Sequence, residues 1–158
     1  MKIKKWIPYG VGIGIAEGVG ILSGLLSRQG MDQFNALSAK PPLTPPMWLF
    51  PVVWGILYAL MGIGSVRIWR SEPSKARHQG LNLYVFQLVL NFFWSLIFFN
   101  VAAYGFAFLW LVVLWFAVLA MIWQFYKVDS VAAWLQVPYL IWLTFAAYLN
   151  LGVWLMNK

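Results

Sequence analysis

The feature that most constrains this chain is a stretch, residues 78–126, that contains no Asp, Glu, Lys or Arg. About 20 apolar residues in a helix cross the hydrocarbon core of a bilayer, so this stretch is long enough for two crossings. Two further charge-free runs cover residues 41–66 and 130–157. We therefore expect the chain to be embedded in the lipid bilayer.

The composition of the 158 residues agrees with a membrane location, because 63% are hydrophobic and only 9% are charged. A soluble domain of this length could not bury so much apolar surface. The sequence contains no Cys, which removes disulfide scaffolds and thiolate metal sites. Its single His, His78, can form neither a His metal cluster nor a Ser-His-Asp triad. We therefore expect no metal and no required cofactor.

The apolar runs predict an all-α integral membrane protein, with one domain over residues 1–158 built as a bundle of five transmembrane helices. The expected spans are, in chain order, about 6–27, 47–69, 81–100, 105–126 and 131–156. A closed barrel would need alternating apolar and polar residues in short strands, and blocks this long and continuously apolar argue against it.

The distribution of basic residues predicts the orientation of the helices. Eight of the 11 Lys and Arg residues lie at the N-terminus, in the 67–79 connection and at Lys127. Because cytoplasmic segments carry the excess of Lys and Arg, we expect the N-terminus inside and the C-terminus outside. The net charge of +7 is then a signal for topology and lipid headgroups, and we expect no nucleic-acid partner.

The first span carries a carboxylate, Glu17, among glycines. Small residues recur every four positions in two rows, a spacing that lets helices approach closely in lipid. The rows are Gly10, Gly14 and Gly18, and Ala16, Gly20 and Gly24. Glu17 points toward the side of Gly10 and Gly14, so it should face protein or a cavity rather than acyl chains. A charged side chain at mid-membrane costs about 2.5–3.5 kcal/mol on insertion scales. Two interpretations stay open, a functional carboxylate and a neutral, hydrogen-bonded structural residue.

Aromatic and polar side chains predict a ligand site inside the bundle. Trp54 and Trp142 lie within their spans, a few residues after a proline, whereas most of the 11 Trp residues suit packing or interfacial belts. One face of the third span holds a row of polar groups, namely Tyr84, Gln87, Asn91 and Ser95. Such a row is most simply explained by hydrogen bonds between helices. Together with the aromatic planes it also suits a large, flat, mostly apolar ligand.

Three blocks of the sequence carry a family resemblance. They are KPPLTPPMWLFPVVW at 40–54, QLVLNFFWS at 87–95 and VPYLIW at 137–142. On these blocks the chain resembles the translocator protein (TspO) family, also called tryptophan-rich sensory proteins or peripheral-type benzodiazepine receptors. The resemblance implies five transmembrane helices, a homodimer and a pocket for porphyrins, sterols and synthetic ligands. It also implies a bacterial cytoplasmic membrane as the location.

By motif position, the resemblance implies a set of ligand-binding residues in that pocket. They are Pro45, Trp54, Tyr58, Asn91, Trp94, Trp142 and Ala146. The expected ligand is a porphyrin, protoporphyrin IX, and the expected function is a tetrapyrrole or stress sensor or scavenger. Alternatives are a porphyrin or sterol carrier and a light-dependent protoporphyrin-degrading enzyme in which Trp54 and Trp142 are catalytic. A sterol stays an open partner, although the family's C-terminal sterol pattern has no match after Asn150.

Overall fold

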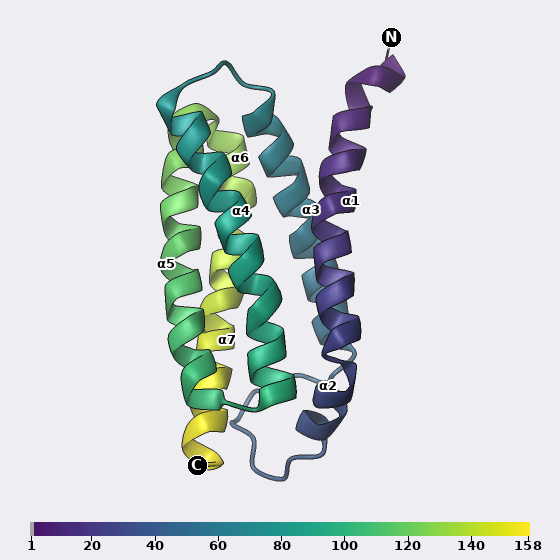
Figure 1. The fold of residues 1–158 in the computed structure, drawn as a ribbon, viewed down its shortest axis with the longest axis vertical. Coiled ribbons are helices and arrows are strands. Elements are labelled where there is room, and N and C mark those ends of the chain that lie inside the picture. The colour runs from purple at the N-terminus through teal and green to yellow at the C-terminus, as the bar shows by residue number, and fades with distance from the viewer. Residues whose placement is uncertain (1) are drawn as a thin grey trace.

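The computed structural model describes residues 2–158, and every regular element in that range is a helix (Figure 1). The elements are α1 (Lys2–Leu26), α2 (Arg28–Asn35), α3 (Leu49–Trp69), α4 (Lys75–Ser95), η1 (Leu96–Val101), α5 (Tyr104–Val128), α6 (Ser130–Leu135) and α7 (Val137–Met156). They form five helical stretches long and apolar enough to cross a membrane. The predicted fold class, an all-α bundle of five transmembrane helices, is confirmed.

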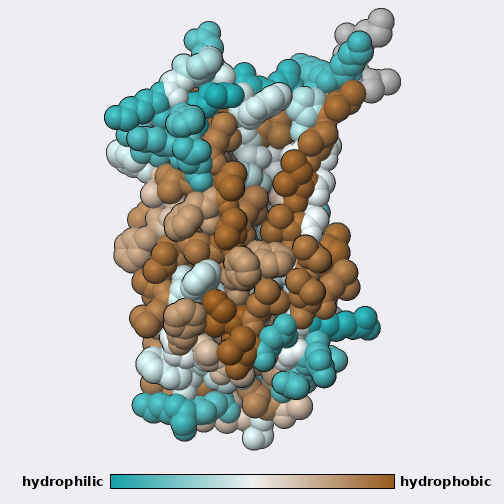
Figure 2. All heavy atoms as spheres, viewed as in Figure 1, coloured by the Kyte–Doolittle hydropathy of each residue, from teal (hydrophilic) through white to brown (hydrophobic). Residues whose placement is uncertain are grey.

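Hydrophilic residues gather at the two ends of the molecule and a hydrophobic belt lies between them (Figure 2). The N-terminal end of α1 and the α3–α4 connection lie at one end (Figure 1). At the other end lie α2, the long loop that follows it and the end of α7. This arrangement suits a bilayer, because exposed apolar side chains in the belt meet acyl chains instead of water.

The third transmembrane helix is longer than expected at both of its ends. α4 begins at Lys75 because the Ser74 side chain accepts a hydrogen bond from the Arg77 backbone N–H at 3.1 Å. At its other end the helix widens into the π-helical turn η1, and Ala102 ends that turn in the left-handed region at φ 56°. Hydropathy marks the part of a helix that lies in lipid, whereas caps fix where the helix begins.

The fifth span is divided between α6 and α7 at Gln136, two residues before Pro138. The Gln136 side chain donates to the Leu60 backbone carbonyl at 3.1 Å, which ties the break to α3. Asp129 caps the start of α6: its carboxylate accepts from the Val131 backbone N–H and pairs with the Arg67 guanidinium at 2.6 Å. Burial raises the pKa of Asp129, but the hydrogen bonds and charge of Arg67 outweigh it, so this pKa lies below its ordinary value.

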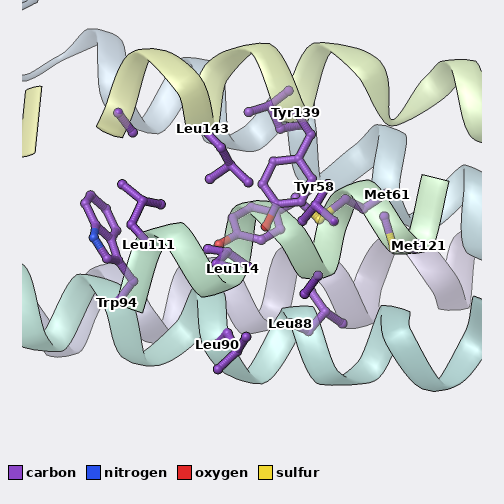
Figure 3. Close-up of a cluster of buried hydrophobic side chains, with 14 of the residues drawn as sticks. Tyr58, Met61, Leu88, Leu90, Trp94, Leu111, Leu114, Met121, Tyr139 and Leu143 are labelled. Carbon is purple, nitrogen blue, oxygen red and sulfur yellow. The ribbon is translucent and has the colours of Figure 1, made fainter. Parts of the chain in front are cut away.

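The packed core lies among α3, α4, α5 and α7. Figure 3 shows Met61, Leu88, Leu114, Met121 and Tyr139 meeting there from different helices. α5 packs against α4 and α7, whereas α1 packs mainly on α3 and stands at the side of the bundle (Figure 1). The helix that carries Glu17 is therefore the least enclosed of the five.

The close approach of α1 to α3 does not use the first of the two predicted rows of small residues. A Cβ at Gly10, Gly14 or Gly18 would meet nothing within 4 Å, so this row faces open space. The contact is made at Gly12, which lies against Gly62 of α3, and at Gly20 of the second row, which lies against the Tyr58 ring. Residue spacing identifies a row that could pack closely, but it does not say which row meets a neighbour.

Gly62→Ala should loosen this helix pair. The added Cβ would lie 2.6 Å from the Ile13 Cα, and a backbone atom cannot rotate away, so α1 must shift. We expect a loss of about 1–3 kcal/mol, seen as a lower thermal unfolding midpoint in detergent. Gly10→Ala is the control, and it should be neutral or slightly stabilising because its Cβ meets open space and Ala favours helix. Equal midpoints for the two variants would contradict this packing.

Candidate functional site

A cavity of about 460 Å³ opens in the half of the bundle nearest α2. Its walls come from α1, α2, the N-terminal half of α3, the junction of α4 with η1, and the middle of α7. Most of the lining is apolar, with a few charged and polar groups among it. A concave, mostly apolar site of this size is typical of small-molecule binding.

Aromatic rings from three different helices form much of the wall. Trp54 on α3 lies edge-to-face with Trp142 on α7, with 6.4 Å between ring centroids and 89° between planes. Trp54 also lies 5.5 Å from the ring of Tyr58, one turn further along α3. Across the cavity, Trp94 on α4 stacks on Phe98 of η1 at 5.1 Å. The rings present flat, rigid surfaces at the cost of little side-chain entropy.

Five of the seven predicted site residues line the cavity. They are Trp54, Tyr58, Trp94, Trp142 and Ala146. Pro45 lies in the loop 36–48 and Asn91 is buried behind the wall, and neither lines the cavity. The structure thus brings most of the set together, while contact of any of these residues with a ligand stays a prediction.

Both polar atoms of the Asn91 side chain take part in a hydrogen-bond network that joins three helices. Its Oδ1 accepts from the Tyr58 hydroxyl at 2.6 Å, and its Nδ2 donates to the Tyr139 hydroxyl at 2.7 Å. The Tyr139 hydroxyl in turn donates to Gln87 Oε1 at 2.7 Å. Figure 3 shows the rings of Tyr58 and Tyr139 close together in the core. Asn91 therefore orients the Tyr58 ring that faces the cavity.

The two remaining wall tryptophans differ in their hydrogen bonding. Trp94 Nε1 donates to Asn150 Oδ1 at 3.1 Å, and Asn150 Nδ2 donates to the Tyr104 backbone carbonyl. These bonds fix the plane of the Trp94 ring between α4 and α7. Trp142 Nε1 is buried, and no acceptor for it is present among the residues that the structure describes. A buried indole N–H without a partner is costly, so Trp142 keeps a hydrogen-bond donor that the described residues do not use.

The roof of the cavity is formed by α2 and the loop 36–48. α2 lies flat on η1, because Gly30 has no side chain to separate it from the Phe99 backbone. The Asn100 side chain donates to the Leu26 backbone carbonyl at 2.7 Å and holds the corner between α1 and α2. The loop is attached to α7 by the Tyr148 hydroxyl, which donates to the Pro42 carbonyl at 2.7 Å.

Sequence reasoning missed the residues that α2 and η1 contribute to the wall. Met31 and Phe34 on α2 line the cavity, as does Phe98 on η1. The only available signal was the three-residue spacing of Met31 and Phe34, which is typical of one face of a helix. The segment lies between two expected spans and is too short to cross a membrane, so hydropathy does not identify it as a helix.

Charged groups occupy two levels of the cavity. Arg28 and Asp32 line it from α2, in the roof, and both are exposed. Glu17 lines it from α1 and is half-buried. The side chain of Glu17 therefore faces the cavity, which is one of the two environments that its position on the helix predicted.

A five-helix bundle with an aromatic-walled cavity defines a class, that of integral membrane proteins with a binding site inside the helices. The chain belongs to the TspO/MBR family, whose model matches residues 12–155. It is 38% identical to the translocator protein of Ovis aries, over 97% of this chain and 92% of that protein. It is 38% identical to the tryptophan-rich sensory protein of Cereibacter sphaeroides, over 75% and 73%, and 30% identical to the tryptophan-rich protein TspO of Chlorobaculum tepidum, over 98% of each.

Proposed function

We propose that this membrane protein binds a porphyrin, protoporphyrin IX or a similar flat tetrapyrrole, in its cavity and acts as a tetrapyrrole or stress sensor or scavenger. The observation that carries the proposal is the set of ring planes from α3, α4 and α7 around one apolar space. A sensory role is supported by the name of the Cereibacter sphaeroides relative, a tryptophan-rich sensory protein.

The chemistry of the cavity suits an amphipathic macrocycle. Trp54, Trp94 and Trp142 offer faces and edges against which an extended aromatic ring can pack. Arg28 on α2 offers a guanidinium to the carboxylates that protoporphyrin carries on one edge. The ring would then lie among the tryptophans, with its carboxylates toward α2 and water.

A substitution that fills the cavity tests this proposal directly. Gly55 lines the cavity, and a Cβ there would meet nothing within 4 Å, so Gly55→Leu can enter the space without a backbone clash. We expect its dark affinity for protoporphyrin IX, titrated by absorbance and tryptophan quenching, to fall by at least about tenfold. Gly14→Leu is the matched control, because Gly14 also has open space around it but does not line the cavity. Equal affinities for the two variants would place porphyrin elsewhere.

Light-dependent degradation of the bound porphyrin is a second candidate function, favoured by one observation. Two oxidisable indoles, Trp54 and Trp142, lie edge-to-face at 6.4 Å and both line the cavity. A ring bound there would contact both of them. An indole is much easier to oxidise than a phenyl ring, so the two tryptophans could supply electrons to an excited porphyrin.

The double variant Trp54→Phe, Trp142→Phe separates binding from photochemistry. Phe keeps an aromatic plane, so the dark binding free energy should weaken by only about 1 kcal/mol through lost contact area. If the indoles take part in the reaction, illumination should bleach protoporphyrin in the presence of the wild type and not with the double variant. Equal bleaching rates would show that neither tryptophan takes part in the light reaction and that both only line the cavity.

We propose a bacterial cytoplasmic membrane as the location, with the N-terminus inside and the C-terminus outside. Basic residues support this orientation: Arg70 donates to the Lys5 carbonyl at 2.9 Å, so the N-terminal segment and the α3–α4 connection lie together. The test is a fusion after Lys158, in a bacterial host, of a reporter enzyme that works only outside the cytoplasm. We expect this fusion to show reporter activity. Activity of a cytoplasm-dependent reporter at the same site would reverse the orientation.

A further inference from the structure

Glu17 lines the cavity from α1, away from the roof. It precedes the end of α1 at Leu26 by nine residues, so about 14 Å of helix separate it from the end nearest the roof. Arg28 and Asp32, the charged groups of α2 that line the cavity, lie in the roof itself. The inner part of the cavity, meaning the part away from the roof, therefore carries a carboxyl group of its own.

This carboxyl group has no partner in the protein. Among residues 4–158, whose side chains the structure describes, none donates a hydrogen bond to Glu17, and the one ion pair joins Arg67 to Asp129 at the opposite end of the bundle. Its polar neighbours on the cavity wall are occupied elsewhere. The Tyr58 hydroxyl donates to Asn91, and the Ser23 hydroxyl donates to the Phe92 carbonyl at 3.0 Å. The Glu17 oxygens therefore remain free to accept a hydrogen bond from a ligand in the cavity.

Aromatic rings lie beside the same position. Gly20 follows Glu17 by one helical turn on the same face, and a Cβ on Gly20 would lie 2.9 Å from Tyr58 Cζ. Tyr58 in turn lies 5.5 Å from the Trp54 ring. A carboxylate attracts a cation by its charge, and an aromatic face attracts it by its quadrupole. Both attractions strengthen where water is excluded.

We propose that Glu17 makes the inner cavity a site for a protonated nitrogen, so that flat, apolar amines form a second ligand class beside tetrapyrroles. The aromatic walls would hold the ring system, and the carboxylate would accept a charge-assisted hydrogen bond from the N–H⁺ group. This inference goes beyond the proposed porphyrin function but needs the same cavity. A porphyrin binds through its faces and outer carboxylates and does not require Glu17.

Two probes of nearly the same shape test the proposal. 9-Aminoacridine is a cation at neutral pH, whereas acridine is mostly neutral there. Their binding to the purified protein is measured by tryptophan quenching in a non-ionic detergent at neutral pH. We expect the wild type to bind the cation at least about tenfold more tightly than acridine. This comparison needs no variant, so it stands even if a substitution fails to fold.

Glu17→Gln then assigns the preference to one residue. The amide keeps the shape of the side chain and removes its charge, so binding of 9-aminoacridine should weaken about tenfold while acridine binding stays within about twofold. Glu72→Gln is the matched control, because Glu72 is exposed outside the cavity and its loss changes the net charge equally. Thermal unfolding of each variant checks the fold.

Three results would overturn the proposal: no preference for the cation in the wild type, no binding of either probe, or an unchanged preference in Glu17→Gln. Protoporphyrin IX titrated into the same variants keeps the two proposals apart. Porphyrin binding that survives Glu17→Gln leaves the proposed function intact whether or not the amine site exists. Amine binding without porphyrin binding would support Glu17 as an amine site and reject the tetrapyrrole function.

Discussion

A short chain of hydrogen bonds through Asn91 joins the helices in the half of the bundle that contains the cavity. Lipid offers no hydrophobic force between helices, so packing and polar contacts must position them. Asn91 on α4 links Tyr58 on α3 to Tyr139 on α7, and Gln87 completes the set. These helices also carry Trp54, Trp94 and Trp142, so the geometry of the aromatic walls depends on one amide behind them.

The bundle is divided along its length into a packed part and a hollow part. At the end that carries the α3–α4 connection, fully buried side chains fill the space between the helices, among them Ile68, Met121 and Phe125. Toward α2 the glycines at positions 24 and 55 line open space, and the helices are held apart by rings. Small residues thus have two opposite uses here: at Gly62 they bring backbones together, and at Gly55 they leave volume unfilled.

The sequence predicts the membrane helices well because charge-free runs have one main physical explanation in a chain of this composition. It also predicts the convergence of Trp54 and Trp142, through motifs that the family shares. It does not predict α2, which is too short to be recognised by hydropathy. The polar row on the third span predicts that Asn91 forms hydrogen bonds between helices, as it does, but it does not predict the partners. The partner of its Nδ2, Tyr139, lies 48 residues away on another helix, and spacing along one helix cannot identify such a contact.

The roof is attached by hydrogen bonds to the C-terminal end of the chain, although more than 100 residues separate them in sequence. Tyr148 and Asn157, on and after α7, donate to the backbone carbonyls of Pro42 and Ala39 in the loop 36–48. Gly152 leaves room for Pro41 between these two attachments. A movement of the final turns of α7 would therefore pull directly on the roof. A contact made at that end of α7 would therefore also act on the loop that covers the cavity.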